Sequence, residues 1–147
     1  MLYLDTSALL KLYMVETGSS WVQQQVVSQD DPLPIWELQE AELMNALHLK
    51  VFWGEYSPEE VASQIDHFQS RKKRGMYQFP YLDRSALMDR FRVLSELSMK
   101  LGTRTLDVLH VACACELKAD GFLTFDSRQT ELAEKAGLQI HYPPQTS

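Results

Sequence analysis

Two short apolar segments of this 147-residue chain each end directly on an aspartate. Residues 2–4 run into Asp5, and residues 122–125 run into Asp126. Short apolar runs bounded by polar residues are typical of buried strands. In an open α/β sheet, ligands bind at the edge formed by the carboxyl ends of the strands. We therefore expect two carboxylates from opposite ends of the chain to meet at one edge of a sheet.

A third aspartate, Asp107, lies within the otherwise apolar segment 106–112, Leu-Asp-Val-Leu-His-Val-Ala. An ionised carboxylate in apolar surroundings is costly unless a positive charge compensates it. Arg104 is the only lysine or arginine within a helical turn of Asp107. A bound cation shared with the other carboxylates is the simplest explanation, and it indicates a metal-dependent enzyme.

Apolar runs alternate with segments of helical periodicity along the whole chain. Strands are expected at residues 2–4, 33–36, 76–82, 121–125 and 138–142. Helices are expected at residues 6–13, 17–28, 40–52, 58–74, 83–102, 105–118 and 127–136, with Thr105 as the cap of the helix that carries Asp107. This alternation predicts an α/β fold with a parallel or mostly parallel sheet and helices on both faces. No linker divides the chain, so we expect one domain over residues 1–142 and a short tail over residues 143–147.

The composition narrows the class of protein. With 45% hydrophobic and 23% charged residues, the chain has the balance of a globular domain. A formal net charge of −6 argues against a protein that coats nucleic acid by bulk electrostatics. Two cysteines, Cys113 and Cys115, give neither a disulfide framework nor a zinc site. No signal peptide or membrane span is recognisable, so we expect no membrane association and a cytoplasmic location.

Four acids come together at one sheet edge in this arrangement: Asp5, Glu42, Asp107 and Asp126. Such close carboxylates repel one another unless cations bind between them. Oxygen ligands without a His/Cys set suit Mg²⁺, with Mn²⁺ as an alternative. Carboxylate sites that hold two such ions activate water for in-line phosphodiester cleavage.

Four motifs follow one another along the chain: LDTSAL at residues 4–9, ELMNAL at 42–47, DVLHVA at 107–112 and LTFD at 123–126. In this order they resemble the PIN-domain nucleases, most closely the VapC-type toxins of toxin–antitoxin modules. The likeness extends from Met1 to about Tyr142. It implies a five-stranded parallel sheet in an α/β/α sandwich and a Mg²⁺-dependent ribonuclease acting on RNA. It also implies homodimers and inhibition by a small cognate antitoxin.

The resemblance assigns the acidic metal ligands to Asp5, Glu42, Asp107 and Asp126, with hydroxyl support from Ser7 and Thr124. From the residues alone, Asn45 is a further supporting candidate because it lies one turn from Glu42, although a plain polar helix position explains it equally well. Glu37 and Glu40 are rivals of Glu42. Asp5 and Asp126 have an alternative role as helix N-caps. His110 is either a general base or a buried, hydrogen-bonded histidine.

A basic run, Arg71, Lys72, Lys73 and Arg74, is a candidate RNA contact, but basic residues at a helix C-terminus also match the helix dipole. Trp53 and Tyr56 are candidates for a homodimer or antitoxin surface.

Two other functions stay open: a housekeeping PIN nuclease in RNA processing, and a binding module that has kept the fold without catalysis. An aspartyl-nucleophile phosphohydrolase is disfavoured, because the second acid that it needs is replaced by Ser7.

Overall fold

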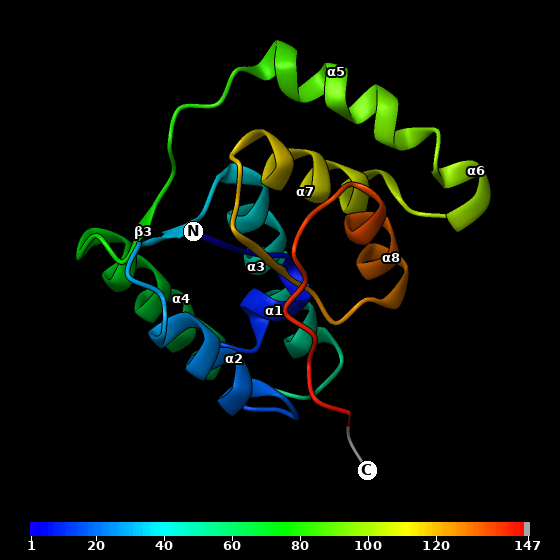
Figure 1. The fold of residues 1–147 in the computed structure, drawn as a ribbon. Coiled ribbons are helices and arrows are strands. Elements are labelled where there is room, and N and C mark those ends of the chain that lie inside the picture. The colour runs from blue at the N-terminus through cyan, green and yellow to red at the C-terminus, as the bar shows by residue number, and fades with distance from the viewer. Residues whose placement is uncertain (146–147) are drawn as a thin grey trace.

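The structure is a computed structural model that describes residues 1–145. Its strands form two parallel pairs, one through the centre of the molecule and one at its side (Figure 1). β1 (Leu2–Leu4) pairs with β4 (Gly121–Leu123), with Tyr3 opposite Phe122. β2 (Leu33–Pro34) pairs with β3 (Tyr77–Gln78). A single parallel bridge joins Phe122 to Ile140.

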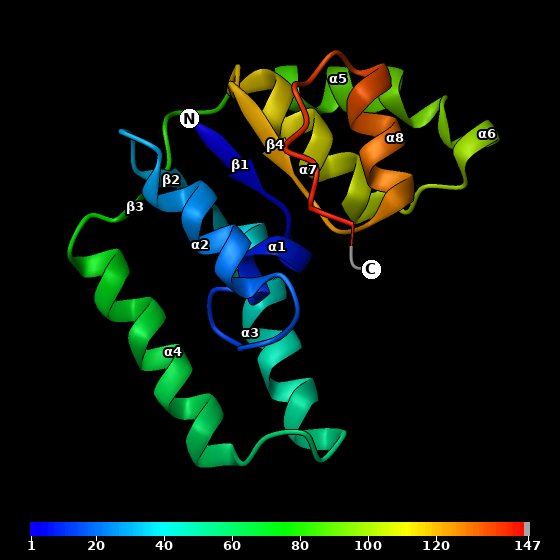
Figure 2. The ribbon, with the colours of Figure 1, turned by 60° about the horizontal axis from the view of Figure 1, so that its bottom comes forward.

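Eight helices surround these strands within residues 1–145, and Figure 2 shows α3 and α4 projecting from the body as a long hairpin. Their bounds are α1 Thr6–Leu10, α2 Ser19–Val27, α3 Glu37–Phe52, α4 Pro58–Lys73, α5 Arg84–Ser95, α6 Ser98–Leu101, α7 Thr105–Glu116 and α8 Ser127–Lys135. No helix in this part of the chain combines the length and apolar character needed to cross a membrane.

Two hydrophobic cores lie on opposite sides of β1, because successive side chains of a strand point to opposite faces. Leu2 and Leu4 belong to one core, which they share with apolar side chains of α1, α2, α3 and α4. Tyr3 belongs to the other core, which is formed with α5, α7 and α8. The prediction of helices on both faces of the strands is therefore confirmed.

The strands are shorter than the sequence predicts, and five paired parallel strands are not seen among the described residues. The expected strand over residues 76–82 is reduced to β3, and Pro80 follows with no N–H for a ladder. The expected strand over residues 138–142 is reduced to the bridge at Ile140, where His141 N–H donates to the Phe122 carbonyl at 2.9 Å before Pro143 and Pro144. The expected tail, residues 143–147, extends beyond the described residues at positions 146 and 147.

Three helix predictions need correction. The helix expected over residues 6–13 ends at Leu10 and continues as turns. The helix expected over residues 83–102 is interrupted, because Leu97 N–H donates to the Leu94 carbonyl in a tighter turn. Thr105 is the first residue of α7 rather than its cap, a position that Arg104 occupies without a side-chain cap hydrogen bond.

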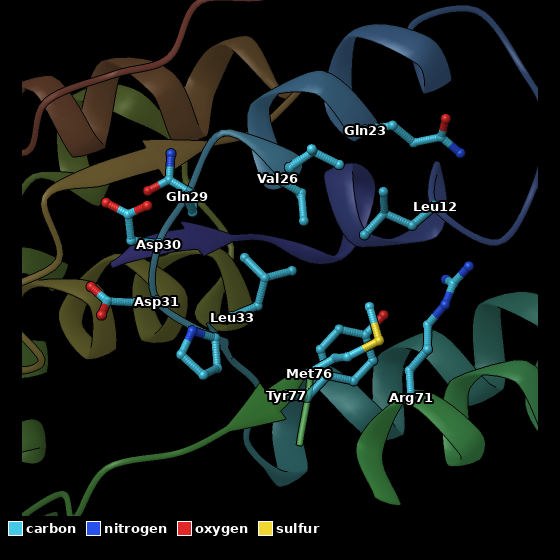
Figure 3. Close-up of a pocket in the computed structure, with 12 residues that line it drawn as sticks. Leu12, Gln23, Val26, Gln29, Asp30, Asp31, Leu33, Arg71, Met76 and Tyr77 are labelled. Carbon is cyan, nitrogen blue, oxygen red and sulfur yellow. The ribbon is translucent and has the colours of Figure 1, made fainter. Parts of the chain in front are cut away.

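The basic run lies at the amino-terminal edge of the strands, opposite the edge that carries Asp5. It ends α4 just before β3, and two of its members, Arg71 and Lys72, contact other side chains of the molecule. Arg71 lies over the Tyr13 ring at 5.0 Å and lines a pocket of about 470 Å³ (Figure 3). Lys72 pairs with Glu40 at 2.8 Å. The structure therefore separates this candidate RNA contact from the acidic residues.

Candidate active site at the carboxyl edge of the strands

Asp5 follows β1 and is buried, with 5% of its surface exposed. Its Oδ1 accepts hydrogen bonds from the Ser7 hydroxyl at 2.7 Å and from Ala8 N–H at 3.0 Å, so it also serves as the N-cap of α1. The Thr124 hydroxyl lies 2.8 Å from its Oδ2. Burial raises the pKa of Asp5 above its usual value, despite these hydrogen bonds to the charged form. The capping and site roles predicted for Asp5 are compatible in this geometry.

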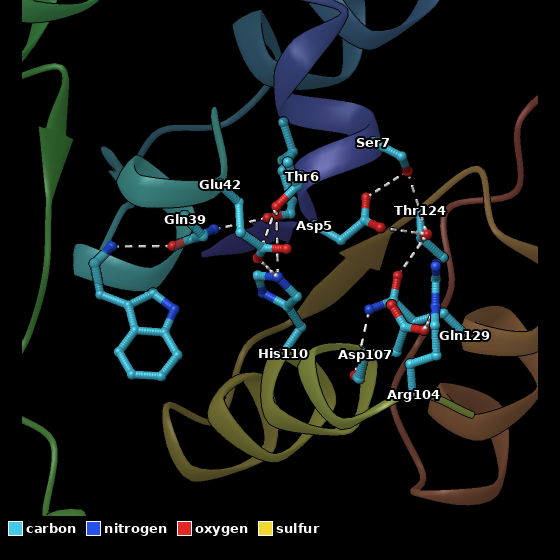
Figure 4. A network of polar contacts seen from close by, with 12 residues as sticks. Asp5, Thr6, Ser7, Gln39, Glu42, Arg104, Asp107, His110, Thr124 and Gln129 are labelled. Carbon is cyan, nitrogen blue, oxygen red and sulfur yellow. Dashed lines mark hydrogen bonds and ion pairs between the residues drawn. The ribbon is translucent and has the colours of Figure 1, made fainter. Parts of the chain in front are cut away.

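Thr124 connects Asp5 to the residues that follow β4 (Figure 4). Its hydroxyl accepts from Asp126 N–H at 3.1 Å and faces two acceptors, Asp5 Oδ2 at 2.8 Å and Gln129 Oε1 at 2.7 Å. The Gln129 amide is oriented by its Nε2, which donates to the Asp107 carbonyl at 3.3 Å. One hydroxyl proton cannot serve both acceptors, and burial, which raises the pKa of Asp5, favours the protonated form that supplies a second donor.

Asp107 and Asp126 share a single cation, Arg104. The Arg104 Nε lies 3.4 Å from Asp107 Oδ2, and its Nη2 lies 3.9 Å from Asp126 Oδ2. The Arg104 side chain is 80% exposed, whereas that of Asp107 is 16% exposed. Asp126 keeps its other oxygen, Oδ1, for the N-terminus of α8, where it accepts from the backbone N–H of Arg128 and Gln129. The predicted capping role of Asp126 is therefore also present.

Glu42 approaches from α3 on the other side of β1. Its Oε1 accepts from the Thr6 hydroxyl at 3.0 Å and contacts His110 Nε2, which comes from α7. Burial acts to raise the pKa of Glu42, but the hydrogen bonds from His110 and Thr6 outweigh it and hold the pKa below the usual value. Glu42 is therefore held as a carboxylate, whereas its rival Glu40 is paired with Lys72.

Asp107 and Asp126 line an open pocket of about 470 Å³ together with Arg104 and Arg128. Among the described residues, no three His, Cys, Asp or Glu side chains are placed closely enough to hold one metal ion. The donor set still fits a hard divalent cation, because it consists of carboxylate and hydroxyl oxygens and already holds the guanidinium of Arg104 between two of its acids.

The structure connects Ser7, Thr124 and Asp5 by direct hydrogen bonds, as the supporting role predicts. Asn45 is exposed on α3, and no contact with the acids is described for it within residues 1–145.

Sequence reasoning missed three polar residues: Thr6, Gln39 and Gln129. Gln39 and Gln129 are fully buried, and the Gln39 amide donates to the Leu4 carbonyl at 2.7 Å. The sequence signal for the two glutamines was weak, because a glutamine near the start of a helix is ordinarily expected on the surface.

Neither the protein-family models nor the curated proteins contain a match to this sequence. Solved structures do match it in fold. VapC20 from Mycobacterium tuberculosis, a sarcin–ricin loop cleaving toxin, has a TM-score of 0.69 at 10% identity, with 98% of this chain and 100% of that chain covered. VapBC2 from Rickettsia felis, bound to a promoter DNA fragment, has a TM-score of 0.67 at 16% identity, with 96% of this chain and 98% of that chain covered. FitAcB from Neisseria gonorrhoeae has a TM-score of 0.66 at 14% identity, with 97% of this chain and 98% of that chain covered. The chain therefore has the fold of a VapC-like PIN domain.

Proposed function

We propose that this chain is a Mg²⁺-dependent endoribonuclease, with Mn²⁺ as an alternative ion, and the toxin of a toxin–antitoxin pair. Its substrate would be RNA, its partners a small antitoxin and a second copy of itself, and its location the cytoplasm. The similarity in fold to VapC20, a toxin that cleaves RNA, and to the VapBC and FitAcB complexes supports the proposal.

The observation that carries the proposal is the set of acids at the carboxyl edge of the strands. Asp5, Asp107 and Asp126 come from three distant segments and are linked by Thr124, Gln129 and Arg104. Bringing carboxylates close together costs stability, because like charges repel. A cluster of this kind is typical of functional sites whose ionisable groups have a chemical task.

Asp5, Glu42, Asp107 and Asp126 would hold the metal. The bound ion would supply an activated water and stabilise the charge that develops during phosphodiester hydrolysis. Asp5 is oriented for this role by Ser7, Ala8 and Thr124, so its carboxylate does not have to be reorganised when charge arrives. The 3′-oxygen of the cleaved bond would leave, giving a 3′-hydroxyl and a 5′-phosphate.

Arg104 and Arg128 supply the positive charge of this pocket. The guanidinium of Arg104 is exposed beside Asp107 and Asp126, so it would be placed to contact an RNA phosphate if these acids held a metal ion. Arginine suits this contact because its planar fork matches phosphate oxygens. These two residues therefore replace the distant basic run as the first candidates for positioning RNA at the acids.

The projecting end of the α3–α4 hairpin is the candidate surface for the homodimer or antitoxin contact. Phe52 is 82% exposed and Trp53 is 56% exposed. Large apolar side chains exposed together mark interaction surfaces.

Cleavage of RNA by the purified protein tests the nuclease. We expect cleavage in Mg²⁺, none in EDTA, and recovery when Mg²⁺ is returned in excess. Asp83→Asn is the matched control, since Asp83 caps α5 with its carboxylate and is remote in sequence from the four motifs. Cleavage that persists in EDTA would contradict the proposal. Growth arrest on expression, relieved by the product of a short adjacent reading frame, would distinguish a toxin from a housekeeping nuclease.

A further inference from the structure

A chain of polar side chains runs from the buried core to Glu42. The Trp36 indole Nε1 donates to the Tyr3 hydroxyl at 2.9 Å, and that hydroxyl lies 2.8 Å from His110 Nδ1. The other ring nitrogen of His110, Nε2, contacts Glu42 Oε1. Trp36, Tyr3 and His110 are 7%, 0% and 2% exposed, so water does not compete for these hydrogen bonds.

One assignment of protons directs every contact of this chain toward Glu42. An indole nitrogen only donates, so the Tyr3 oxygen is the acceptor from Trp36. When the Tyr3 hydroxyl donates to His110 Nδ1, the imidazole proton lies on Nε2 and is donated to Glu42.

Both hydrogen bonds to Glu42 use the same oxygen. His110 and Thr6 donate to Oε1, and no hydrogen bond to Oε2 is described within residues 1–145. A carboxylate fixed through one oxygen keeps the other oxygen available in a defined direction. The Glu42 side chain is 23% exposed, so it is partly open to solvent while His110 is buried.

We propose that Trp36, Tyr3 and His110 are positioning residues that fix one oxygen of Glu42 so that its other oxygen is presented to a divalent ion. The inference rests on the proposed function, in which Glu42 is a metal ligand. Side chains that orient ligands in this way typically change metal affinity by about 10- to 100-fold when they are removed. Neither His110 nor Tyr3 touches substrate or metal in this account, so their effect passes through Glu42.

Tyr3→Phe is the decisive variant, because it removes one oxygen from the middle of the chain. The matched control is Tyr13→Phe, which removes a buried hydroxyl paired with the Tyr77 hydroxyl in the opposite core. In Mn²⁺ titrations by calorimetry we expect Kd to rise by about 10-fold or more in Tyr3→Phe. It should stay near the wild-type value in Tyr13→Phe.

Two replacements of His110 separate positioning from packing. His110→Gln keeps an N–H donor near the place of Nε2, and we expect most of the Mn²⁺ affinity to be retained. His110→Leu fills the space without a donor, and we expect a loss as large as that of Tyr3→Phe. Equal affinity in Gln, Leu and wild-type proteins would overturn the inference. If His110→Leu does not fold, Tyr3→Phe against Tyr13→Phe decides.

A metal-free measurement distinguishes failure of this inference from failure of the proposed function. Long-range ¹H–¹⁵N spectra report which ring nitrogen of His110 carries the proton. We expect only the Nε2–H form in wild type and Tyr13→Phe. In Tyr3→Phe we expect a mixture of the two tautomers or the Nδ1–H form. A wild-type protein that shows this tautomer but binds no Mn²⁺ would refute the metal function and leave the hydrogen-bond chain intact. An Nδ1–H form, or no response to Tyr3→Phe, would overturn the chain itself.

Discussion

We expect Asp5→Asn to stabilise the metal-free protein while abolishing most of its response to Mg²⁺. Asparagine keeps the acceptor oxygen that Ser7 and Ala8 use, and it adds an N–H donor toward the Thr124 hydroxyl. It therefore reproduces the protonated form of Asp5 without its ionisation. One additional net hydrogen bond contributes about 1 kcal/mol. In a domain of this size, that corresponds to a rise in Tm of about 2–4 °C.

The pH dependence of this gain has a definite sign. Burial raises the pKa of Asp5 in the folded state, so its contribution to stability is fully present below about pH 3.9, the pKa of an unfolded aspartate. That contribution is lost as the pH rises through the folded-state pKa. The difference in Tm between Asp5→Asn and wild type should therefore be largest near neutral pH and shrink as the pH falls toward 4.

Thermal unfolding in EDTA and in a Mg²⁺ series is the assay. Ligand binding to the folded state raises the Tm of wild type with increasing Mg²⁺, and Asp5→Asn should show a much smaller rise. Asp83→Asn, an exposed N-cap that asparagine replaces equally well, should match wild type in both conditions. A Tm in EDTA near neutral pH that is lower for Asp5→Asn than for wild type would refute the reasoning. So would a difference in Tm between the two proteins that does not shrink as the pH falls toward 4.

Three further predictions concern charge and assembly. Arg104→Gln removes the cation that Asp107 and Asp126 share, so calorimetry should give a lower Kd for Mg²⁺. RNA binding should weaken and depend less on salt. An unchanged Kd for Mg²⁺ would show that Arg104 does not compete with metal. Replacing Lys72, Lys73 and Arg74 together by Gln should leave single-turnover cleavage at saturating RNA near wild type, because the run lies at the opposite edge of the strands; a collapse of that rate would contradict its placement. Trp53→Ala should reduce the assembled fraction in light scattering if the hairpin end is the self-association surface, and a monomeric wild type would remove that assignment.

The parts that the sequence predicted are those that depend on neighbouring residues. Asp5 and Asp126 were placed correctly at strand ends, because each follows a short apolar run within its own segment. The start of α4 was also predicted, since Ser57 and Glu60 form a capping box around Pro58.

The parts that were missed depend on distant residues. The contact between His110 and Glu42 joins positions 68 residues apart, and the Tyr3 hydroxyl meets His110 across 107 residues. No local pattern specifies such pairs, and nothing in the sequence around Tyr3 or Trp36 marks either residue as part of the site. The strand lengths were overestimated for a similar reason, because pairing of β4 ends where a tertiary partner, the Ser7 hydroxyl, takes over the backbone N–H of Phe125.

Cleavage of a labelled RNA in Mg²⁺ by wild type, Asp107→Asn and Asp83→Asn, with the ends of the products identified, tests the central claim most directly. Asparagine keeps the size of Asp107 and removes one of the charges that would hold the metal. The account predicts 3′-hydroxyl and 5′-phosphate products from wild type and Asp83→Asn, and a rate that is lower by orders of magnitude for Asp107→Asn. Equal cleavage by Asp107→Asn and wild type, unaffected by EDTA, would contradict the assignment of these carboxylates to a metal-dependent ribonuclease.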